Sequence, residues 1–240
     1  MIDVKFLVVA SFRHWYMIFT VGFFIAIAML SGLLQPLFSA DLPGKLQPIF
    51  HGNAAEPKVA LACNVFWGEE FLPDMLSTLA ENDTKITFFI GGSWAKRYPD
   101  VLKDISLKGH ELGNHSYSHP HPNSLSKEKN KEQITRTEDL VRELTGVKTD
   151  LYAPPYGEYN ETVLYAAQEI GYRTIMWSID TIDWKRPPVE IIKNRVIKKL
   201  HNGAIILIHP TESTAKALPE LIKEIKNQGY QITTVSDILI

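Results

Sequence analysis

Short apolar runs alternate with longer amphipathic stretches along most of the chain. The apolar runs cover residues 58–65, 86–90, 110–114, 150–153, 173–179, 204–208 and 231–235. Between them, apolar positions recur at helical spacing over residues 69–82, 93–108, 126–145, 158–170, 188–200 and 214–227. Runs of the first kind predict buried strands, and stretches of the second kind predict helices. Their alternation predicts an α/β fold with parallel strands, either an open doubly wound sheet or a barrel.

The amino-terminal part of the chain has a different pattern. Residues 15–34 contain no charged side chain, and at about 1.5 Å per helical residue they could cross a hydrocarbon core of about 30 Å. Lys5, Arg13 and His14 precede this run, and basic residues on that side of an apolar run stay in the cytoplasm. We therefore expect a cytoplasmic segment 1–14, a transmembrane helix and an extracytoplasmic carboxyl-terminal domain, as in a single-pass protein of the cell membrane.

A cleaved signal peptide is the alternative to a retained anchor. Its one plausible cleavage point, after Ala40, has bulky Phe38 where a small residue is needed. Residues 35–56 are rich in proline and other chain breakers and predict a linker. The periodic pattern then places the globular domain at residues 57–240.

The composition excludes several classes of function. A formal net charge of −2 over 240 residues provides no basic excess for binding nucleic acid. Cys63 is the only cysteine, which excludes an intrachain disulfide and a cysteine-rich metal cluster. Its place in an apolar run predicts a buried thiol. The first strand-to-helix turn lacks a glycine-rich phosphate fingerprint, which argues against a nucleotide site.

Polar side chains with chemical capacity follow the predicted strands. They are Asn64, His115, His119, Tyr156, Asp180, Asp183 and His209. Open parallel sheets and parallel barrels both place ligands at the carboxyl ends of their strands. The sequence therefore predicts a single site built from these side chains.

His115 and His119 are candidate metal ligands. Neutral imidazole commonly binds zinc and similar divalent ions, and two histidines four residues apart can converge on one ion. Pro120 disfavours a regular helix beyond His119, so we expect the pair on a loop. The spacing alone fits a loop of hydrogen-bonded histidines equally well. His121 is interpreted as a bystander.

His209, Asp183 and Trp184 suggest a second half of the site. An imidazole with a pKa near 6.5 can hold and give a proton near neutrality, so His209 could protonate a leaving amine. Asp183 is the natural partner to orient that ring. Trp184 offers an apolar wall on which a sugar ring could lie.

Five short motifs, in order along residues 57–240, resemble those of the polysaccharide deacetylases, carbohydrate esterase family 4, whose domain is also called the NodB homology domain. The matching residues are Asn64 and Val65 in "ACNV", His115, Ser116 and His119 in "HSYSH", Pro154, Pro155, Tyr156 and Gly157 in "YAPPYG", Asp183 and Trp184 in "DTIDW", and Leu207 and His209 in "LIH". The stretch "NVFWGEE" and the short linker look most similar to the sporulation-type branch of the family.

The resemblance implies a distorted (β/α) barrel and a function. Members of the family remove N-acetyl groups from amino-sugar glycans with a divalent metal ion, here expected to be zinc, with cobalt, nickel or manganese as alternatives. The implied partner is an N-acetylated glycan of the cell envelope, peptidoglycan or chitin-like. By resemblance, Tyr156, Pro155, Trp184 and Leu207 contact the substrate, and the backbone amide of Tyr156 holds the oxyanion.

The first motif departs from the family pattern. The family reads Thr-Phe-Asp-Asp, whose first aspartate is the general base and whose second is a metal ligand, but Asn64 and Val65 stand at these positions. An amide cannot take a proton from water at neutral pH, and a valine cannot bind a metal ion. Loss of a general base typically costs a factor of about 10²–10⁴ in rate. Two imidazoles without a carboxylate should hold the metal ion weakly, unless Glu69 or Glu70 supplies the missing ligand, and of these Glu69 is the candidate.

A third departure accompanies the first two. The family arginine that pairs with the catalytic aspartate is Ala153 here. Removing one member of a buried ion pair leaves an uncompensated charge, whereas replacing both members with neutral groups costs little. The changes at Asn64 and Ala153 therefore look coordinated. Two hypotheses follow: a deacetylase-like hydrolase with reduced activity, or a catalytically inactive glycan-binding pseudoenzyme.

Overall fold

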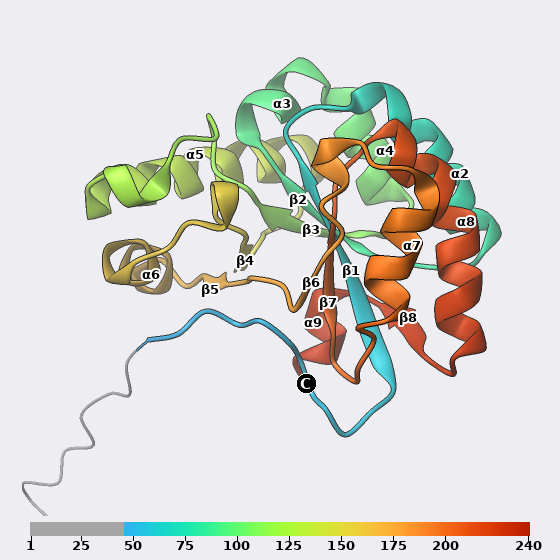
Figure 1. Cartoon of the computed structure of the whole chain (residues 1–240). Helices are drawn as coiled ribbons and strands as arrows, with labels where there is room; N and C mark the ends of the chain where they lie inside the picture. The colour runs from blue at the N-terminus through green and yellow to red at the C-terminus, as the bar shows by residue number, and fades with distance from the viewer. Residues whose placement is uncertain (1–45) are drawn as a thin grey trace, which may run out of the picture. The chain divides into compact units, whose positions relative to one another are not determined.

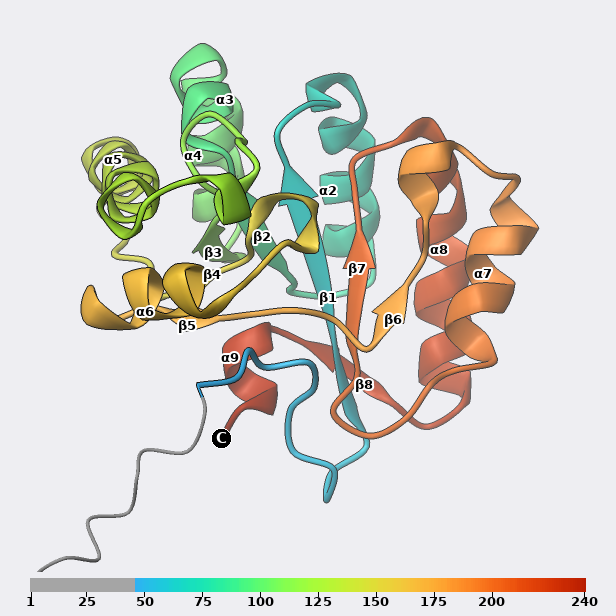
Figure 2. The ribbon, with the colours of Figure 1, turned by 60° about the vertical axis from the view of Figure 1, so that its left-hand side comes forward.

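The computed structural model describes residues 46–240, which fold around one parallel sheet. Its strands are β1 (Lys58–Val65), β2 (Thr87–Ile90), β3 (Glu111–Asn114), β4 (Leu151–Tyr152), β5 (Arg173–Thr174), β6 (Ile179–Asp180), β7 (Ile205–Ile208) and β8 (Gln231–Thr233). Their order is β5-β4-β3-β2-β1-β7-β6, and β8 pairs with the first residues of β1. The sheet curls into a half-barrel (Figures 1 and 2). The barrel-like architecture, rather than an open doubly wound sheet, is therefore confirmed.

Helices follow most of the strands. They are α2 (Leu72–Glu81), α3 (Gly92–Arg97), α4 (Pro99–Leu107), α5 (Lys127–Thr145), α6 (Glu161–Glu169), α7 (Val189–Ile197), α8 (Glu212–Asn227) and α9 (Val235–Ile238). Short 3₁₀ turns occupy η1 (Glu69–Phe71), η2 (Pro122–Ser124), η3 (Pro155–Gly157) and η4 (Asp183–Lys185). Two of these turns, η3 and η4, follow β4 and β6 and carry residues of the predicted site.

Two predicted elements are divided in the structure. The helix expected over residues 93–108 becomes α3 and α4, because Pro99 has no N–H to continue α3 and instead begins α4. The strand expected over 173–179 becomes β5 and β6. Between them the backbone changes partners: Met176 donates to the carbonyl of Ile49, and Ser178 donates to that of Ile205.

Side chains alternate between the two faces of the central strands, and this alternation determines the direction in which the site residues point. In β1, Val59, Leu61 and Cys63 pack in the core between the sheet and the outer helices, and Cys63 is buried as expected. Ala60 and Ala62 face the inside of the curl. Successive side chains of a strand point to opposite faces, so Asn64 continues the inner row at the carboxyl end. By the same alternation, His209, the first residue after β7, points to the same side as Leu207, and both line the cavity described below.

The segment predicted as the second half of the linker packs on the domain. Ile49 forms a parallel bridge with Ile175, and His51 forms an antiparallel bridge with Ala204. The backbone of Gly52 lies so close to Ile238 that a Cβ atom there would come within 2.1 Å of its carbonyl oxygen. Residues 46–56 therefore belong to the same compact unit as the sheet.

The predicted transmembrane helix, residues 15–34, lies outside the described residues, as do segment 1–14 and linker residues 35–45. Within residues 46–240, none of the helices is long and apolar enough to span a membrane.

Candidate active site

A cavity of about 480 Å³ opens at the carboxyl ends of the strands. It is lined by Asn64, Phe66, Trp67, His115, His119, Tyr156, Gly157, Trp177, Asp180, Trp184, Leu207 and His209. Eight of the eleven residues expected at the site from sequence, Asp180 among them, thus share one lining. The other three, Asp183, Pro155 and Glu69, are not part of it. Asp183 and Pro155 are buried.

His115 and His119 lie next to each other, with ring centroids 4.9 Å apart. Nδ1 of His115 is 2.7 Å from the carbonyl oxygen of Ala153. A carbonyl only accepts hydrogen bonds, so Nδ1 carries the proton and Nε2 keeps its lone pair. Burial, with the charge of His119, lowers the pKa of His115 to about 3, which keeps the ring neutral. A neutral imidazole whose other nitrogen is bound to a carbonyl is the usual state of a metal-binding histidine.

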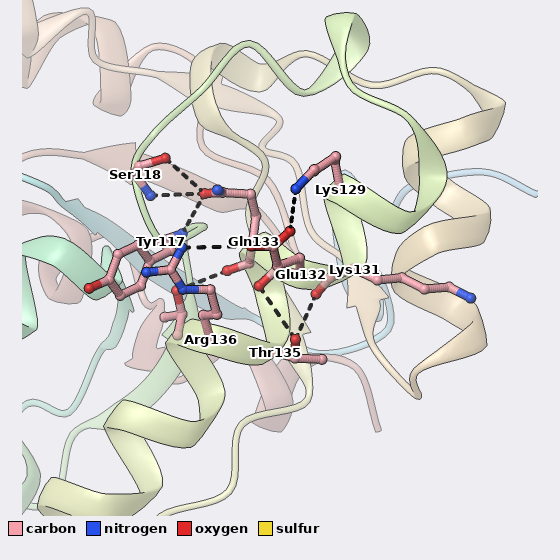
Figure 3. A network of polar contacts seen from close by, with 9 residues as sticks. Tyr117, Ser118, Lys129, Lys131, Glu132, Gln133, Thr135 and Arg136 are labelled. Atoms are coloured by element: carbon pink, nitrogen blue, oxygen red, sulfur yellow. Dashed lines mark hydrogen bonds and ion pairs between the residues drawn. The ribbon is translucent and has the colours of Figure 1, made fainter.

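The loop that carries the two histidines is fastened to α5 (Figure 3). Oε1 of Gln133 accepts hydrogen bonds from the backbone N–H of Tyr117, the backbone N–H of Ser118 and the hydroxyl of Ser118, at 2.9–3.1 Å. Arg136 lies over the ring of Tyr117, 3.9 Å from its centroid. His119 has a φ of 54°, a left-handed conformation that needs support from its surroundings. Gln133 supplies part of this support.

His209 and Asp183 form the expected pair. Nδ1 of His209 lies 2.7 Å from Oδ1 of Asp183, and the backbone N–H of His209 donates to Oδ2 at 2.6 Å. The hydroxyl of Thr214, in the first turn of α8, also donates to Oδ2 at 2.6 Å. Asp183 is 0% exposed, so these three donors replace its hydration. Sequence reasoning missed Thr214, whose only signal was its place near the start of a helix.

The altered first motif lies at the same cavity. Asn64 is 5% exposed, and its Oδ1 is buried without a hydrogen-bond partner. Val65 is fully buried in the core between the sheet and the outer helices. Ala153, at the position of the family arginine, is buried on the inner side of the curl. These three positions therefore contribute no charge to the site.

The structure does not bring Glu69 to the two imidazoles. Its carboxylate interacts instead with the hydroxyl of Tyr98, and this hydrogen bond, with the charge of Arg97, lowers the pKa of Glu69. Glu69 begins η1, which continues into α2, and it lies outside the cavity lining. Within residues 46–240, no group of three or more His, Cys, Asp or Glu side chains could hold a metal ion. Of the three ligand positions that the family resemblance implies, residues 46–240 thus carry a metal-binding type of side chain at two, His115 and His119.

Aromatic rings form much of the cavity wall. Phe66 lies against His119 at a centroid distance of 4.8 Å, and Trp67 stacks on His209 at 5.8 Å with planes 5° apart. Tyr156 and Trp184 are 57% and 51% exposed. Sequence reasoning did not assign Phe66 or Trp67 to the site, although they directly follow Asn64 and Val65.

His121 lies outside the cavity lining. Its ring stacks on Tyr156 with centroids 4.1 Å apart, and its Nδ1 is 2.9 Å from a carboxylate oxygen of Glu158. His121 therefore contacts Tyr156 without being part of the cavity lining.

A curled parallel sheet with a histidine pair and a His–Asp couple around one cavity is the arrangement expected of a polysaccharide deacetylase. The chain belongs to this family: the family model "Polysaccharide deacetylase" matches residues 51–175. The resemblance inferred from the five motifs is therefore confirmed.

Two curated relatives are informative. The chain is 42% identical over 193 residues to the uncharacterized protein YlxY of Bacillus subtilis, an alignment that covers 80% of this chain but only 60% of that protein. It is 34% identical over 191 residues to a peptidoglycan-N-acetylglucosamine deacetylase of Bacillus cereus, covering 78% of this chain and 70% of the relative. The chain thus spans less than two thirds of the first relative and more of the second.

A solved structure with a similar fold is that of a carbohydrate esterase family 4 pseudoenzyme from Bacillus anthracis. The two chains are 39% identical with a TM-score of 0.79, over 81% of this chain and 69% of that one. A mutant of that pseudoenzyme is described as having restored enzymatic activity.

Proposed function

We propose that the protein binds an N-acetylated glycan of the cell envelope, peptidoglycan or chitin-like, and removes its acetyl groups slowly in a metal-dependent reaction. The observation that carries this proposal is the convergence of the His115–His119 pair and the His209–Asp183 pair on one cavity of about 480 Å³. The similarity to a peptidoglycan-N-acetylglucosamine deacetylase supports the class of substrate.

His115 and His119 would hold a divalent ion, for which we propose zinc, with cobalt, nickel or manganese as alternatives. Held there, such an ion would supply Lewis-acid chemistry for an acetamide carbonyl and for water. Asp183 accepts the Nδ1–H of His209 and so leaves Nε2 as the nitrogen that can carry a proton to the departing amine. The backbone amide of Tyr156 would hold the oxyanion.

The reaction should be slow because the chain lacks the family's base. The Asn64 amide cannot accept the proton of the attacking water, and the loss of such a base lowers a rate by about 10²–10⁴. Val65 also leaves the ion with fewer protein ligands, so the metal should be weakly held.

Glycan binding without turnover is the second candidate function. The neutral pair Asn64 and Ala153 favours it, because both members of the family's ion pair have been replaced together. The similarity to a pseudoenzyme with the same fold supports it as well.

Release of acetate tests the two candidates. The full chain and its Asn64→Asp variant are incubated with chitooligosaccharide or peptidoglycan fragments and Zn²⁺, Co²⁺, Ni²⁺ or Mn²⁺. We expect slow release by the native chain and release about 10²-fold faster by Asn64→Asp. His115→Ala should abolish both. Saturable binding with no release by either form would leave glycan binding as the function, and release that survives His115→Ala would exclude the metal mechanism.

We also propose that residues 15–34 anchor the protein in the cell membrane, with the domain outside the cytoplasm, and that the protein belongs to the sporulation-type branch. The uncharged run after Lys5 and Arg13 supports the anchor, and the stretch "NVFWGEE" supports the branch. Protease added to intact protoplasts should digest the domain if the orientation is right. Protection of the domain until the cells are lysed would contradict it.

A further inference from the structure

The amide of Asn64 is an unused polar group at the cavity. It is 5% exposed, it belongs to the cavity lining, and its Oδ1 has no hydrogen-bond partner. Buried polar atoms in folded proteins are nearly always paired, and an unpaired one is destabilising. The unpaired oxygen is therefore available to accept a hydrogen bond from a ligand in the cavity.

The positions altered together with Asn64 carry no charge, and the one carboxylate of the cavity lining, Asp180, already accepts the backbone N–H of Ile182. Ala153 provides no charge where the family has an arginine, and Val65 is packed in the core behind the strand. Nδ1 of His115 donates to the carbonyl of Ala153, so this ring nitrogen is already paired within the protein. Moving an ammonium group from water to such surroundings is costly.

An amide is complementary to another amide. A carboxamide side chain both donates and accepts hydrogen bonds, whereas an ionised carboxylate only accepts them. The acetamido group of an N-acetylated sugar offers one N–H and one carbonyl oxygen, which match the two ends of a carboxamide. The free amino sugar offers an ammonium group, which would match a carboxylate instead.

The same altered motif supplies rings for the sugar. Phe66 and Trp67 directly follow Asn64 and Val65, and each lies against one of the retained histidines, His119 and His209. Trp67 is 38% exposed, so part of its indole is open to the cavity, where the apolar face of a sugar ring can stack on it.

We infer that the altered first motif turns the base position into a reader of acetylation: Asn64 pairs with the acetamido group, and the cavity discriminates N-acetylated glycan from its deacetylated product without a metal ion. This inference rests on the proposed glycan-binding function. It adds that recognition survives removal of metal and depends on the amide of residue 64.

Calorimetry with two defined sugars tests the inference. The full chain, in detergent, is titrated with the tetramer of N-acetylglucosamine and with the fully deacetylated tetramer, first with Zn²⁺ and then with a chelator. In chelator, the native chain should bind the acetylated tetramer about tenfold or more tightly than the deacetylated one. Asn64→Asp, which has the same shape, should lose or reverse this preference. Asn194→Asp makes the same change at an exposed position on α7 and should behave as the native chain.

The possible results separate the inference from the function on which it rests. Equal binding of the two tetramers, or binding that disappears with chelator, would overturn the reader role and leave the proposed function standing. An unchanged preference in Asn64→Asp would also overturn it. Absence of binding to both tetramers, with and without Zn²⁺, would remove the proposed function itself.

Discussion

The hydroxyl of Thr214 donates a hydrogen bond of 2.6 Å to Oδ2 of Asp183, the carboxylate that orients His209. Because Asp183 is fully buried, loss of one donor leaves part of its charge without compensation. We expect Thr214→Val to lower the free energy of unfolding by about 1–3 kcal/mol in urea titrations. Thr214→Ser keeps the hydroxyl and should lose much less. Equal losses in the two variants would assign the effect to packing.

The three hydrogen bonds that Gln133 accepts from the histidine loop give a second prediction. Gln133→Leu removes the acceptor of three hydrogen bonds from the histidine loop. Supporting groups of this kind typically change metal affinity by a factor of about 10–100. We expect Zn²⁺ binding to weaken by about tenfold, measured by competition with a coloured chelator.

Gln133→Glu is the matched control, because a carboxylate can accept the same three hydrogen bonds. It should bind Zn²⁺ at least as well as the native chain. If Gln133→Leu and Gln133→Glu bind the ion equally well, the hydrogen bonds to Gln133 do not position the histidines.

The missing ion pair gives a third prediction. Asn64→Asp places a carboxylate at a 5% exposed position, while Ala153 stands where the family has the pairing arginine, and an unpaired buried charge is destabilising by about 3–5 kcal/mol. Ala153→Arg alone should also destabilise the domain. The double variant should be more stable than the sum of the two single changes predicts, by about 1–3 kcal/mol in a double-mutant cycle. Additive effects would show that the two positions are not coupled.

His110 gives a prediction on pH. Its Nδ1 accepts a hydrogen bond from the backbone N–H of Ile86, and burial, with the charges of Lys85 and Lys108, lowers its pKa to about 4. Between pH 6.5 and pH 4 the unfolded chain therefore binds a proton that the folded chain does not. Stability should fall as pH falls through this range, by up to about 3 kcal/mol from this residue.

The control for this prediction is His110→Asn, which keeps an acceptor for Ile86 but does not titrate. Denaturant titrations at pH 7 and pH 4 should show a smaller loss for this variant than for the native chain. The same pH dependence in both proteins would assign the acid sensitivity to other groups.

Local patterns predicted the sheet and most of the lining of the site. Asn64 and His209 each stand at the end of an apolar run, and the carboxyl ends of parallel strands share one edge, so the sequence alone places both residues there. The division of residues 173–179 could not be predicted, because it depends on the remote backbones of Ile49 and Ile205. The failure of Glu69 to reach the histidines depends on Tyr98, which lies 29 positions further along the chain.

Residues 46–56 contact the domain at one end of the sheet. These residues meet the sheet at its lower end in Figure 2, where α9 lies, while the carboxyl ends of β1 and β7 point to the opposite end. A surface attached through the amino terminus would therefore hold the domain near that end of the sheet and leave the carboxyl ends of the strands accessible. Immobilised through its amino terminus on a sensor chip, the protein should still take up oligosaccharide from solution.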